Sequence, residues 1–355
     1  MPTFGIDVCP ATRRQKTGTE WYTVHLVAAM QQQLKDGEKI LLYSPETLRW
    51  PFKRLWTQGR LAFEMLRRPP DVLFVPSHVV PWVHPKKTVT TIHDIGFVRR
   101  PDLYDAKSRH YLETTTKFAV KHCAKLLTPS EFTKQEVVDV YHVDPEKIIV
   151  TPLAPGQIAT IDPVEINRVR AKYQLTSSTF LTVSRMESKK NIAALIRGFE
   201  IFKERRGIGD PFQLVLVGKP GFGYEKIKPL IERSPAKEAI RELGWVSEED
   251  ITALVAGAFA YVYPSWYEGL GISALEALAA GAPVIASDIP ALHEAAGDAA
   301  LYFNPSDPRE LAREMTKLVE EGTTREALVS HGRSRALELS WDKTAAATWE
   351  VLRSL

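Results

Sequence analysis

Short apolar segments recur along the whole chain, and most of them end in polar or glycine-rich residues. In the first half they lie at residues 4–8, 39–44, 72–77, 88–93, 126–130 and 148–153. In the second half they lie at 180–185, 213–218, 240–246, 260–264, 283–287 and 300–303. Stretches with helical character separate several of them, for example 20–34 and 108–122. Strands that alternate with helices in this way predict an α/β protein with parallel sheets.

This alternation occurs twice, and the turn Ala154-Pro155-Gly156 lies between the two series. A chain of 355 residues is also long for a single hydrophobic core. We therefore expect two Rossmann-like doubly wound domains, at residues 1–155 and 156–339, facing each other across a cleft. A C-terminal helix at 340–355 is free to return to the first domain. Ligands are expected at the carboxyl ends of the strands.

One stretch, 263–287 (YPSWYEGLGISALEALAAGAPVIAS), combines the end of a strand, a turn, a helix and the next strand. Gly269 and Gly271 permit a tight turn, and the residues after Gly271 are strong helix formers. Glu268 precedes this helix, and Glu276 is its only charged residue. Because a helix N-terminus binds anions, two carboxylates beside one predict a nucleotide-sugar site.

Polar or glycine-rich residues also follow other predicted strands, including Gly18 in the first loop, His93-Asp94 and Gly244-Trp245-Val246. Arg185 and Lys190 follow one strand and precede a helix. Two cations and a helix N-terminus can neutralise a diphosphate without a metal. The alternative is a solvated basic turn, and in either case Lys189 is expected to face solvent.

Composition excludes several classes of protein. Cys9 and Cys123 are too few for a disulfide framework or a metal cluster. The sequence has neither an apparent signal peptide nor a run of eighteen apolar residues, so a cytoplasmic protein is expected. Residues 1–155 carry 22 Lys and Arg against 16 Asp and Glu, whereas 156–355 carry 24 against 27. The basic first half could therefore face an anionic surface or acceptor.

Several motifs together resemble the large family of retaining, metal-independent glycosyltransferases with the GT-B architecture, of the family 4 (group 1) type. They are GID, KTGTEWYT, TIHD, TPSEFTK, SR-x4-KN, VGKPG, GWV and the E-x7-E of Glu268 and Glu276. These motifs span almost the whole chain. E-x7-E between glycines, at the usual distance after SR-x4-KN, is the most specific of them.

The resemblance implies roles for ten residues and no metal. Four are assigned to catalysis: His93, Arg185, Lys190 and Glu268. Donor contacts are assigned to Gly18, Arg185, Lys190, Val246, Glu268, Leu270, Gly271, Ile272 and Glu276. In this scheme the two cations hold the diphosphate, Glu276 holds the ribose hydroxyls, and Glu268 and His93 reach the donor sugar. Backbone groups near Val246 recognise the base, and those of residues 270–272 cradle a phosphate oxygen.

Four of these residues also have a purely structural interpretation. Glu276 could pair with a buried arginine, and Glu268 could complement the helix dipole, which contributes about 0.5 kcal/mol. His93 could be a satisfied structural histidine, with Asp94 orienting it. Gly18 could be an ordinary turn glycine.

Residues 48–68 (Leu48 to Arg68) are strongly basic. They contain six cations (Arg49, Lys53, Arg54, Arg60, Arg67 and Arg68) against the single Glu64. Apolar residues lie between them: Trp50, Phe52, Leu55, Trp56, Leu61, Phe63, Met65 and Leu66. Cations interleaved with aromatic residues suit an anionic membrane surface. The alternative is a helix that packs its apolar side on the sheet. No nucleic-acid-binding module accompanies the segment.

The sequence therefore predicts a cytoplasmic hexosyltransferase, peripheral on the inner face of a membrane if residues 48–68 bind lipid. It would move mannose or glucose from a nucleotide-sugar, GDP-mannose ahead of UDP-glucose, to a glycan or lipid-linked acceptor in surface polysaccharide or glycolipid assembly. No cofactor is expected. The alternatives are a nucleotide-sugar epimerase or a phosphorylase on the same fold, and a non-catalytic sugar-nucleotide-binding protein.

Overall fold

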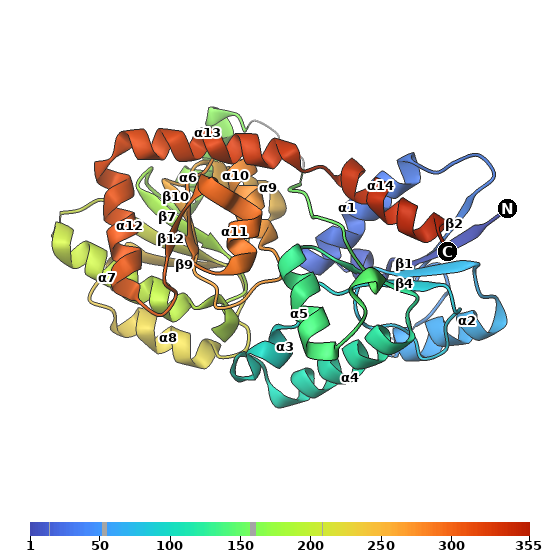
Figure 1. Cartoon of the computed structure of the whole chain (residues 1–355). Helices are drawn as coiled ribbons and strands as arrows, with labels where there is room; N and C mark the ends of the chain where they lie inside the picture. Colours follow the sequence, from blue (N-terminus) through green and yellow to red (C-terminus); the bar gives the residue numbers. More distant parts are fainter. Residues whose placement is uncertain (14, 52–54, 157–160, 208) are drawn as a thin grey trace. The chain divides into compact units, whose positions relative to one another are not determined.

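The computed structural model describes residues 1–13, 15–51, 55–156, 161–207 and 209–355, which fall into two compact units. The first unit consists of Met1–Pro101, Ala106–Ala154 and Leu339–Leu355. The second consists of Asp102–Asp105 and Pro155–Glu338. Each unit has its own parallel sheet with helices packed around it (Figure 1).

The first unit has a six-stranded sheet in the order β2-β1-β3-β4-β5-β6. Its strands are β1 Thr3–Asp7, β2 Lys39–Tyr43, β3 Val72–Val75, β4 Thr88–Thr91, β5 Lys125–Thr128 and β6 Ile148–Val150. Its helices are α1 Gly18–Gln32, α2 Ala62–Arg67, α3 Gly96–Arg99, α4 Ala106–His122, α5 Glu131–Tyr141 and α14 Trp341–Arg353. The strand order reverses beside β1, so the edge beyond β1 and β3 is the expected ligand position in this unit.

The second unit has a six-stranded sheet in the order β12-β11-β10-β7-β8-β9. Its strands are β7 Thr179–Val183, β8 Gln213–Val217, β9 Ile240–Gly244, β10 Ala260–Tyr263, β11 Val284–Ser287 and β12 Ala300–Phe303. Its helices are α6 Pro163–Tyr173, α7 Ile192–Arg206, α8 Tyr224–Arg233, α9 Glu248–Ala256, α10 Ile272–Ala279, α11 Pro290–Ala296, α12 Pro308–Glu320 and α13 Gly322–Glu338. This is the Rossmann strand order, and its switch point lies between β7 and β10.

The twelve predicted strands are confirmed, with ends that differ by up to three residues. The predicted helix 20–34 begins earlier, at Gly18, because Thr17 and Glu20 form a capping box. Glu20 Oε2 accepts a hydrogen bond from Thr17 N at 2.9 Å. Gly18 is therefore the first residue of a helix rather than part of a loop.

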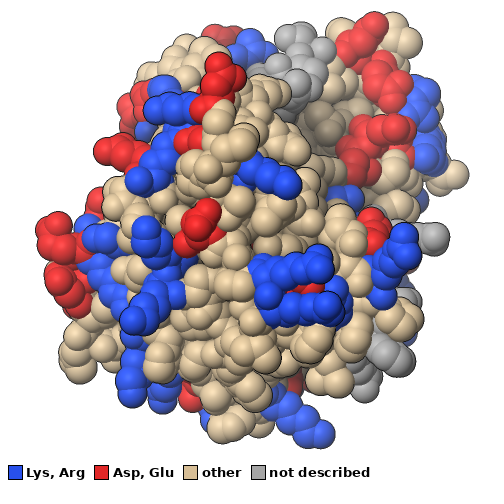
Figure 2. All heavy atoms as spheres, turned by 90° about the vertical axis from the view of Figure 1, so that its right-hand side faces the viewer, with Lys and Arg blue, Asp and Glu red and all other residues tan. Residues whose placement is uncertain are grey.

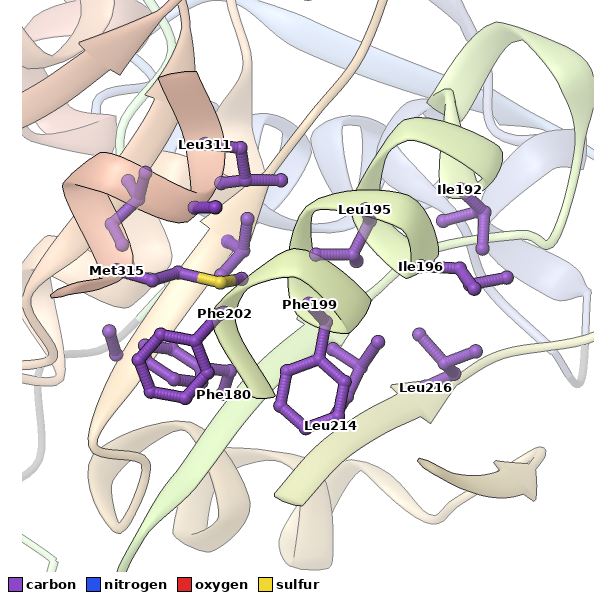
Figure 3. Packing of buried hydrophobic residues seen from close by; sticks show 14 of the residues in the cluster. Phe180, Ile192, Leu195, Ile196, Phe199, Phe202, Leu214, Leu216, Leu311 and Met315 are labelled. Atoms are coloured by element: carbon purple, nitrogen blue, oxygen red, sulfur yellow. The ribbon is translucent and has the colours of Figure 1, made fainter. Parts of the chain in front are cut away.

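An apolar cluster fixes the sheet of the second unit between its helices (Figure 3). Phe180 of β7 is fully buried, and its ring lies 5.3 Å from Phe202 of α7 and 5.2 Å from Phe212. Leu311 and Met315 of α12 close the cluster. Each buried side chain of this size contributes about 1.5–3 kcal/mol by leaving water. This packing holds β7, and with it the loop that carries Arg185, in place.

The last helix, α14, packs beside α1 in the first unit (Figure 1). Trp349 is fully buried, donates a hydrogen bond from Nε1 to Met30 O at 3.0 Å and meets Phe4 edge-to-face at 4.9 Å. Arg353 adds two hydrogen bonds to Glu38, each of 2.8 Å. The chain therefore begins and ends in the same unit. None of the helices in the described ranges combines the length and hydrophobicity needed to cross a bilayer.

Candidate active site at a strand switch point

The switch point of the second unit brings together two residues that lie far apart in the sequence. Lys190 follows β7 and Glu268 follows β10, and these strands are neighbours in the sheet. Lys190 Nζ donates a hydrogen bond to Glu268 Oε1 at 2.6 Å and lies 3.3 Å from Tyr263 Oη. The side chains of the ion pair are 17% and 9% exposed. A desolvated cation and carboxylate thus lie where doubly wound sheets bind ligands.

Backbone hydrogen bonds hold the loop after β7 against the loop after β8. Met186 N donates to Lys219 O at 2.8 Å, and Gly221 N donates to Met186 O at 2.9 Å. Gly218 has φ +141°, and a Cβ there would lie 1.7 Å from Ser184 O, so this contact requires glycine. The loops position Arg185, whose exposed side chain has Nε 3.6 Å from Glu187 Oε2. Arg185 therefore stands at the strand ends with its guanidinium open to solvent.

The entrance to α10 is formed as the sequence predicts. Gly271 has φ +99°, and a Cβ there would also collide with Leu292, so the turn depends on glycine. The backbone N–H groups of Leu270, Gly271 and Ile272 have no acceptor within the described part of the chain. Free N–H groups at the start of a helix form an anion site. Glu268 is buried two residues before this site.

The charges around Glu268 stabilise its carboxylate. Burial acts to raise its pKa, but Lys190 and Lys189 outweigh burial and hold the pKa below its usual value. Lys189 is buried, with Nζ 5.9 Å from the centre of the Tyr267 ring. The expectation that Lys189 faces solvent is therefore wrong. Lys189 ends buried because the 3-10 turn Ser188–Lys190 places it beneath the loop, where its backbone O accepts a hydrogen bond from Trp266 N at 2.9 Å.

Glu276 lies on α10 and has no hydrogen-bond or ion-pair partner among the residues the structure describes. Pairing with a buried arginine, its structural alternative, is therefore not seen there. The side chain reaches solvent, yet the protein packed around it removes enough water to raise its pKa to about 7, and the Glu248 carboxylate adds to this rise. An unpaired carboxylate in a partly dehydrated position can accept hydrogen bonds from a ligand.

The remaining predicted donor contact of this unit follows β9. Gly244 has φ +65°, and its O accepts a hydrogen bond from Gly218 N at 2.8 Å. Val246 is 2% exposed and Trp245 is 55% exposed. Val246 is therefore buried, whereas Trp245 beside it is open to solvent.

His93 and Gly18 belong to the first unit. His93 follows β4, and its Nε2 forms a hydrogen bond with Pro76 O at 2.9 Å. Its ring meets Tyr22 edge-to-face at 4.7 Å. Burial lowers the pKa of His93, while Pro76 O, Asp94 and Glu20 oppose the change. Gly18 is exposed at the start of α1. His93 is thus held in a defined orientation by its Nε2.

Some residues near these sites were not predicted from the sequence. Tyr263 and Lys189 surround the Lys190–Glu268 pair, and Glu20 lies close enough to His93 to affect its pKa. Tyr263 ends an apolar strand and Glu20 lies in a capping box, so the sequence pattern gives each of them a structural role only.

In the described ranges no cluster of three or more His, Cys, Asp or Glu side chains is arranged to hold a metal ion.

Comparison with solved structures identifies the class to which this fold belongs. The structure of HepE from Anabaena in complex with UDP-glucose superposes with a TM-score of 0.79 over 100% of both chains, at 16% sequence identity. The fold is therefore the two-domain GT-B fold, as the sequence predicts.

Sequence comparison then gives the family. Glycosyltransferase Family 4 matches residues 18–154, and Glycosyl transferases group 1 matches residues 165–335. O-antigen chain mannosyltransferase B of Escherichia coli is 30% identical over 76% of this chain and 71% of its own length. O-antigen chain mannosyltransferase RfbU of Salmonella typhimurium is 30% identical over 65% of this chain and 60% of its own. The chain belongs to the group 1 family of glycosyltransferases.

Substitution of Lys190 tests whether the buried ion pair forms. Lys190→Met leaves the Glu268 carboxylate buried without its main partner, so we expect a loss of about 3 kcal/mol in the free energy of unfolding. The double variant Lys190→Met/Glu268→Gln should recover part of this loss, because no buried charge remains. Denaturant unfolding followed by tryptophan fluorescence measures both. Arg185→Met, at an exposed cation, is the control and should change stability by less than about 0.5 kcal/mol. An unchanged stability in Lys190→Met would show that the pair is not formed.

Proposed function

We propose that the protein is a retaining hexosyltransferase that uses a nucleotide-sugar donor and requires no metal. The observation that carries the proposal is the Lys190–Glu268 pair at the switch point, beside the free N–H groups that begin α10. Mannose is the preferred sugar, because the relatives described above are named mannosyltransferases. GDP-mannose is therefore proposed ahead of UDP-glucose.

In this proposal, different residues of the second unit contact different parts of the donor. Arg185 and Lys190 neutralise the diphosphate, together with the N–H groups of residues 270–272. Glu276 accepts hydrogen bonds from the ribose hydroxyls, and the backbone at Val246 contacts the base. Glu268, with its charge fixed by Lys190, accepts a hydrogen bond from a sugar hydroxyl.

The proposed reaction needs no protein nucleophile. The acceptor hydroxyl attacks the anomeric carbon from the face on which the diphosphate leaves, so that the configuration is retained. The new carbon–oxygen bond forms as the bond to the diphosphate breaks, and the acceptor proton passes to the departing phosphate oxygen. His93, oriented by Pro76, contributes a hydrogen bond to the sugar from the first unit. The acceptor is a glycan or a lipid-linked saccharide.

A transfer assay separates this function from its alternatives. Purified protein with GDP-mannose and methyl α-mannoside should yield GDP and an α-linked disaccharide, and UDP-glucose should be a poorer donor. Chromatography and NMR of the product give the yield and the anomeric configuration. Conversion of the donor sugar without acceptor would indicate an epimerase, and binding without turnover a non-catalytic protein. A β-linked product would contradict retention.

Glu276 and His93 are expected to affect different steps. Glu276→Gln should weaken GDP-mannose binding at pH 8 by about 1.5–3 kcal/mol, because hydrogen bonds to a charged carboxylate are lost. His93→Ala should leave binding close to wild type and lower turnover. Calorimetry and the transfer assay measure the two effects. Equal affinity in wild type and Glu276→Gln would overturn the ribose assignment.

Glu276→Gln also tests how donor affinity depends on pH. The pKa of Glu276 is raised to about 7, so its carboxylate is protonated below this pH and charged above it. Donor affinity of the wild type should therefore rise as the pH increases through about 7. Glu276→Gln should remove this rise.

We further propose that an exposed patch on the first unit binds an anionic membrane, at the cytoplasmic face. The patch consists of apolar Leu55, Phe63, Leu66, Trp82 and Val83 with basic Arg49, Arg67 and Arg68. Gln58 joins its two segments, since Trp82 N donates to Gln58 Oε1 at 2.9 Å and Gln58 Nε2 donates to Val80 O at 3.0 Å. Figure 2 views the side of the molecule on which α2 lies and shows several clusters of Lys and Arg among uncharged surface.

The structure narrows the membrane hypothesis for residues 48–68. Trp56, Leu61 and Met65 are buried, and Trp56 Nε1 donates a hydrogen bond to Asp7 Oδ1 at 3.0 Å. These three residues therefore pack inside the first unit, as the structural alternative predicted. Arg60 pairs with Glu64 at 2.7 Å. Phe52, Lys53 and Arg54 lie outside the described residues.

Vesicle binding tests this patch. The wild type should co-sediment with vesicles of phosphatidylcholine and phosphatidylglycerol, but not with phosphatidylcholine alone, and added salt should release it. Arg67→Gln/Arg68→Gln should weaken binding by about 2 kcal/mol, at about 1 kcal/mol for each basic residue. Lys226→Gln/Lys228→Gln on α8, an exposed basic pair of the second unit, is the matched control. Equal binding of the two double variants would contradict the proposal.

A further inference from the structure

His78 lies in the loop after β3, at the edge where the first unit is expected to bind ligands. Two side chains of the neighbouring β4 region hold the backbone of this loop. His93 Nε2 forms a hydrogen bond with Pro76 O at 2.9 Å, and Thr90 Oγ1 donates to Ser77 O at 2.5 Å. The loop is thus fixed on both residues that precede His78. This places His78 at a defined position beside His93.

The imidazole of His78 lacks the hydrogen bonds that a buried ring requires. Both Nδ1 and Nε2 are buried, and neither has a hydrogen-bond partner among the described residues. Its ring contact in the structure is with Phe97, at 6.0 Å between ring centres. A buried polar group without a partner costs about 1–3 kcal/mol, so such groups are uncommon where no ligand or water satisfies them.

The missing partners must accept a hydrogen bond from one ring nitrogen and donate one to the other. Burial lowers the pKa of His78 to about 4, His93 adds to this fall, and Asp94 opposes it. The ring is therefore uncharged at neutral pH, with one N–H donor and one nitrogen acceptor. A fully ionised anion can accept from the ring N–H but cannot donate to the other nitrogen. Sugar hydroxyls, which donate and accept on the same carbon framework, match this ring.

We propose that His78 binds sugar hydroxyls through its two ring nitrogens and is a substrate-positioning residue beside His93. This inference rests on the proposed function, because it assumes that a sugar reaches the first unit. The hydroxyls could belong to the hexose of the donor or to the acceptor glycan. These two sources share the same chemistry and are separated by the experiment below.

Two substitutions separate a ligand-binding role from a structural role. His78→Phe keeps a ring of similar shape beside Phe97 and removes both polar atoms. If His78 serves a ligand, this variant should be as stable as the wild type or more stable, because an unsatisfied buried group is lost. His78→Gln retains a donor and an acceptor and should restore part of the binding. His110→Phe, at an exposed histidine of α4, is the matched control.

Calorimetry with GDP and GDP-mannose, and the KM for methyl α-mannoside, give the readouts. UDP and UDP-glucose replace the guanine pair if the wild type binds only those. Contact with the donor sugar predicts that His78→Phe weakens nucleotide-sugar binding about five- to tenfold and leaves the free nucleotide unaffected. Contact with the acceptor predicts a similar rise in KM for the mannoside at unchanged donor affinity.

The outcomes also distinguish this inference from the proposed function. Changes of less than twofold in both quantities would overturn the role of His78 while the transferase activity stands. A large loss of thermal stability in His78→Phe, without a change in binding, would show a structural role instead. Failure of the wild type to bind either nucleotide-sugar would overturn the proposed function and this inference together.

Discussion

The site in the second unit depends on one constraint, the pairing of Lys190 with Glu268 in a position largely closed to water. A buried carboxylate without a cation would either take up a proton or destabilise the fold. The pair forms because β7 and β10 are neighbours only at the switch point of the strand order. Gly218 lets the loop after β8 support the loop that leads to Lys190, and Gly271 forms the turn after Glu268, each at a position where a Cβ would collide. Connectivity, glycine positions and charge therefore serve the same contact.

This arrangement leaves specific charged and hydrogen-bonding groups available to a ligand. Lys190 and Glu268 largely satisfy each other, so the ligand meets a charge distribution that already exists and needs little reorganisation. Arg185 remains exposed to solvent at the strand ends, and the N–H groups of Leu270, Gly271 and Ile272 lack acceptors in the described part of the chain. An anionic group is favoured there. The unpaired Glu276 carboxylate excludes a second anion at its own position and favours hydroxyl donors.

The sequence was sufficient for the fold and for the elements that carry the candidate residues. Parallel strands buried on both faces appear as short apolar runs, which is why all twelve were found. The direction in which each side chain points could not be predicted from the sequence. Lys189 and Lys190 are adjacent, yet one packs on Tyr267 and the other pairs with Glu268, because a 3-10 turn sends them different ways. Trp56 lies in a segment whose composition suits a membrane contact. Its side chain is nevertheless buried and donates a hydrogen bond to Asp7, 49 residues away in the sequence. Such pairings are set by tertiary structure.

Polar side chains in this chain differ in how completely they are hydrogen-bonded. Asp250, which ties α9 to α6, is paired with Arg168, Lys172 and Tyr173. Asp210 is likewise held by Lys203 and Arg206. Neither buried ring nitrogen of His78 has such a partner among the described residues. Glu276 has none among them for its carboxylate, which reaches solvent. Asp250 thus accepts hydrogen bonds from three side chains, whereas these two groups accept none from the described residues. His78 follows β3 and Glu276 lies on α10, so each keeps hydrogen-bonding capacity for the ligand role proposed for it.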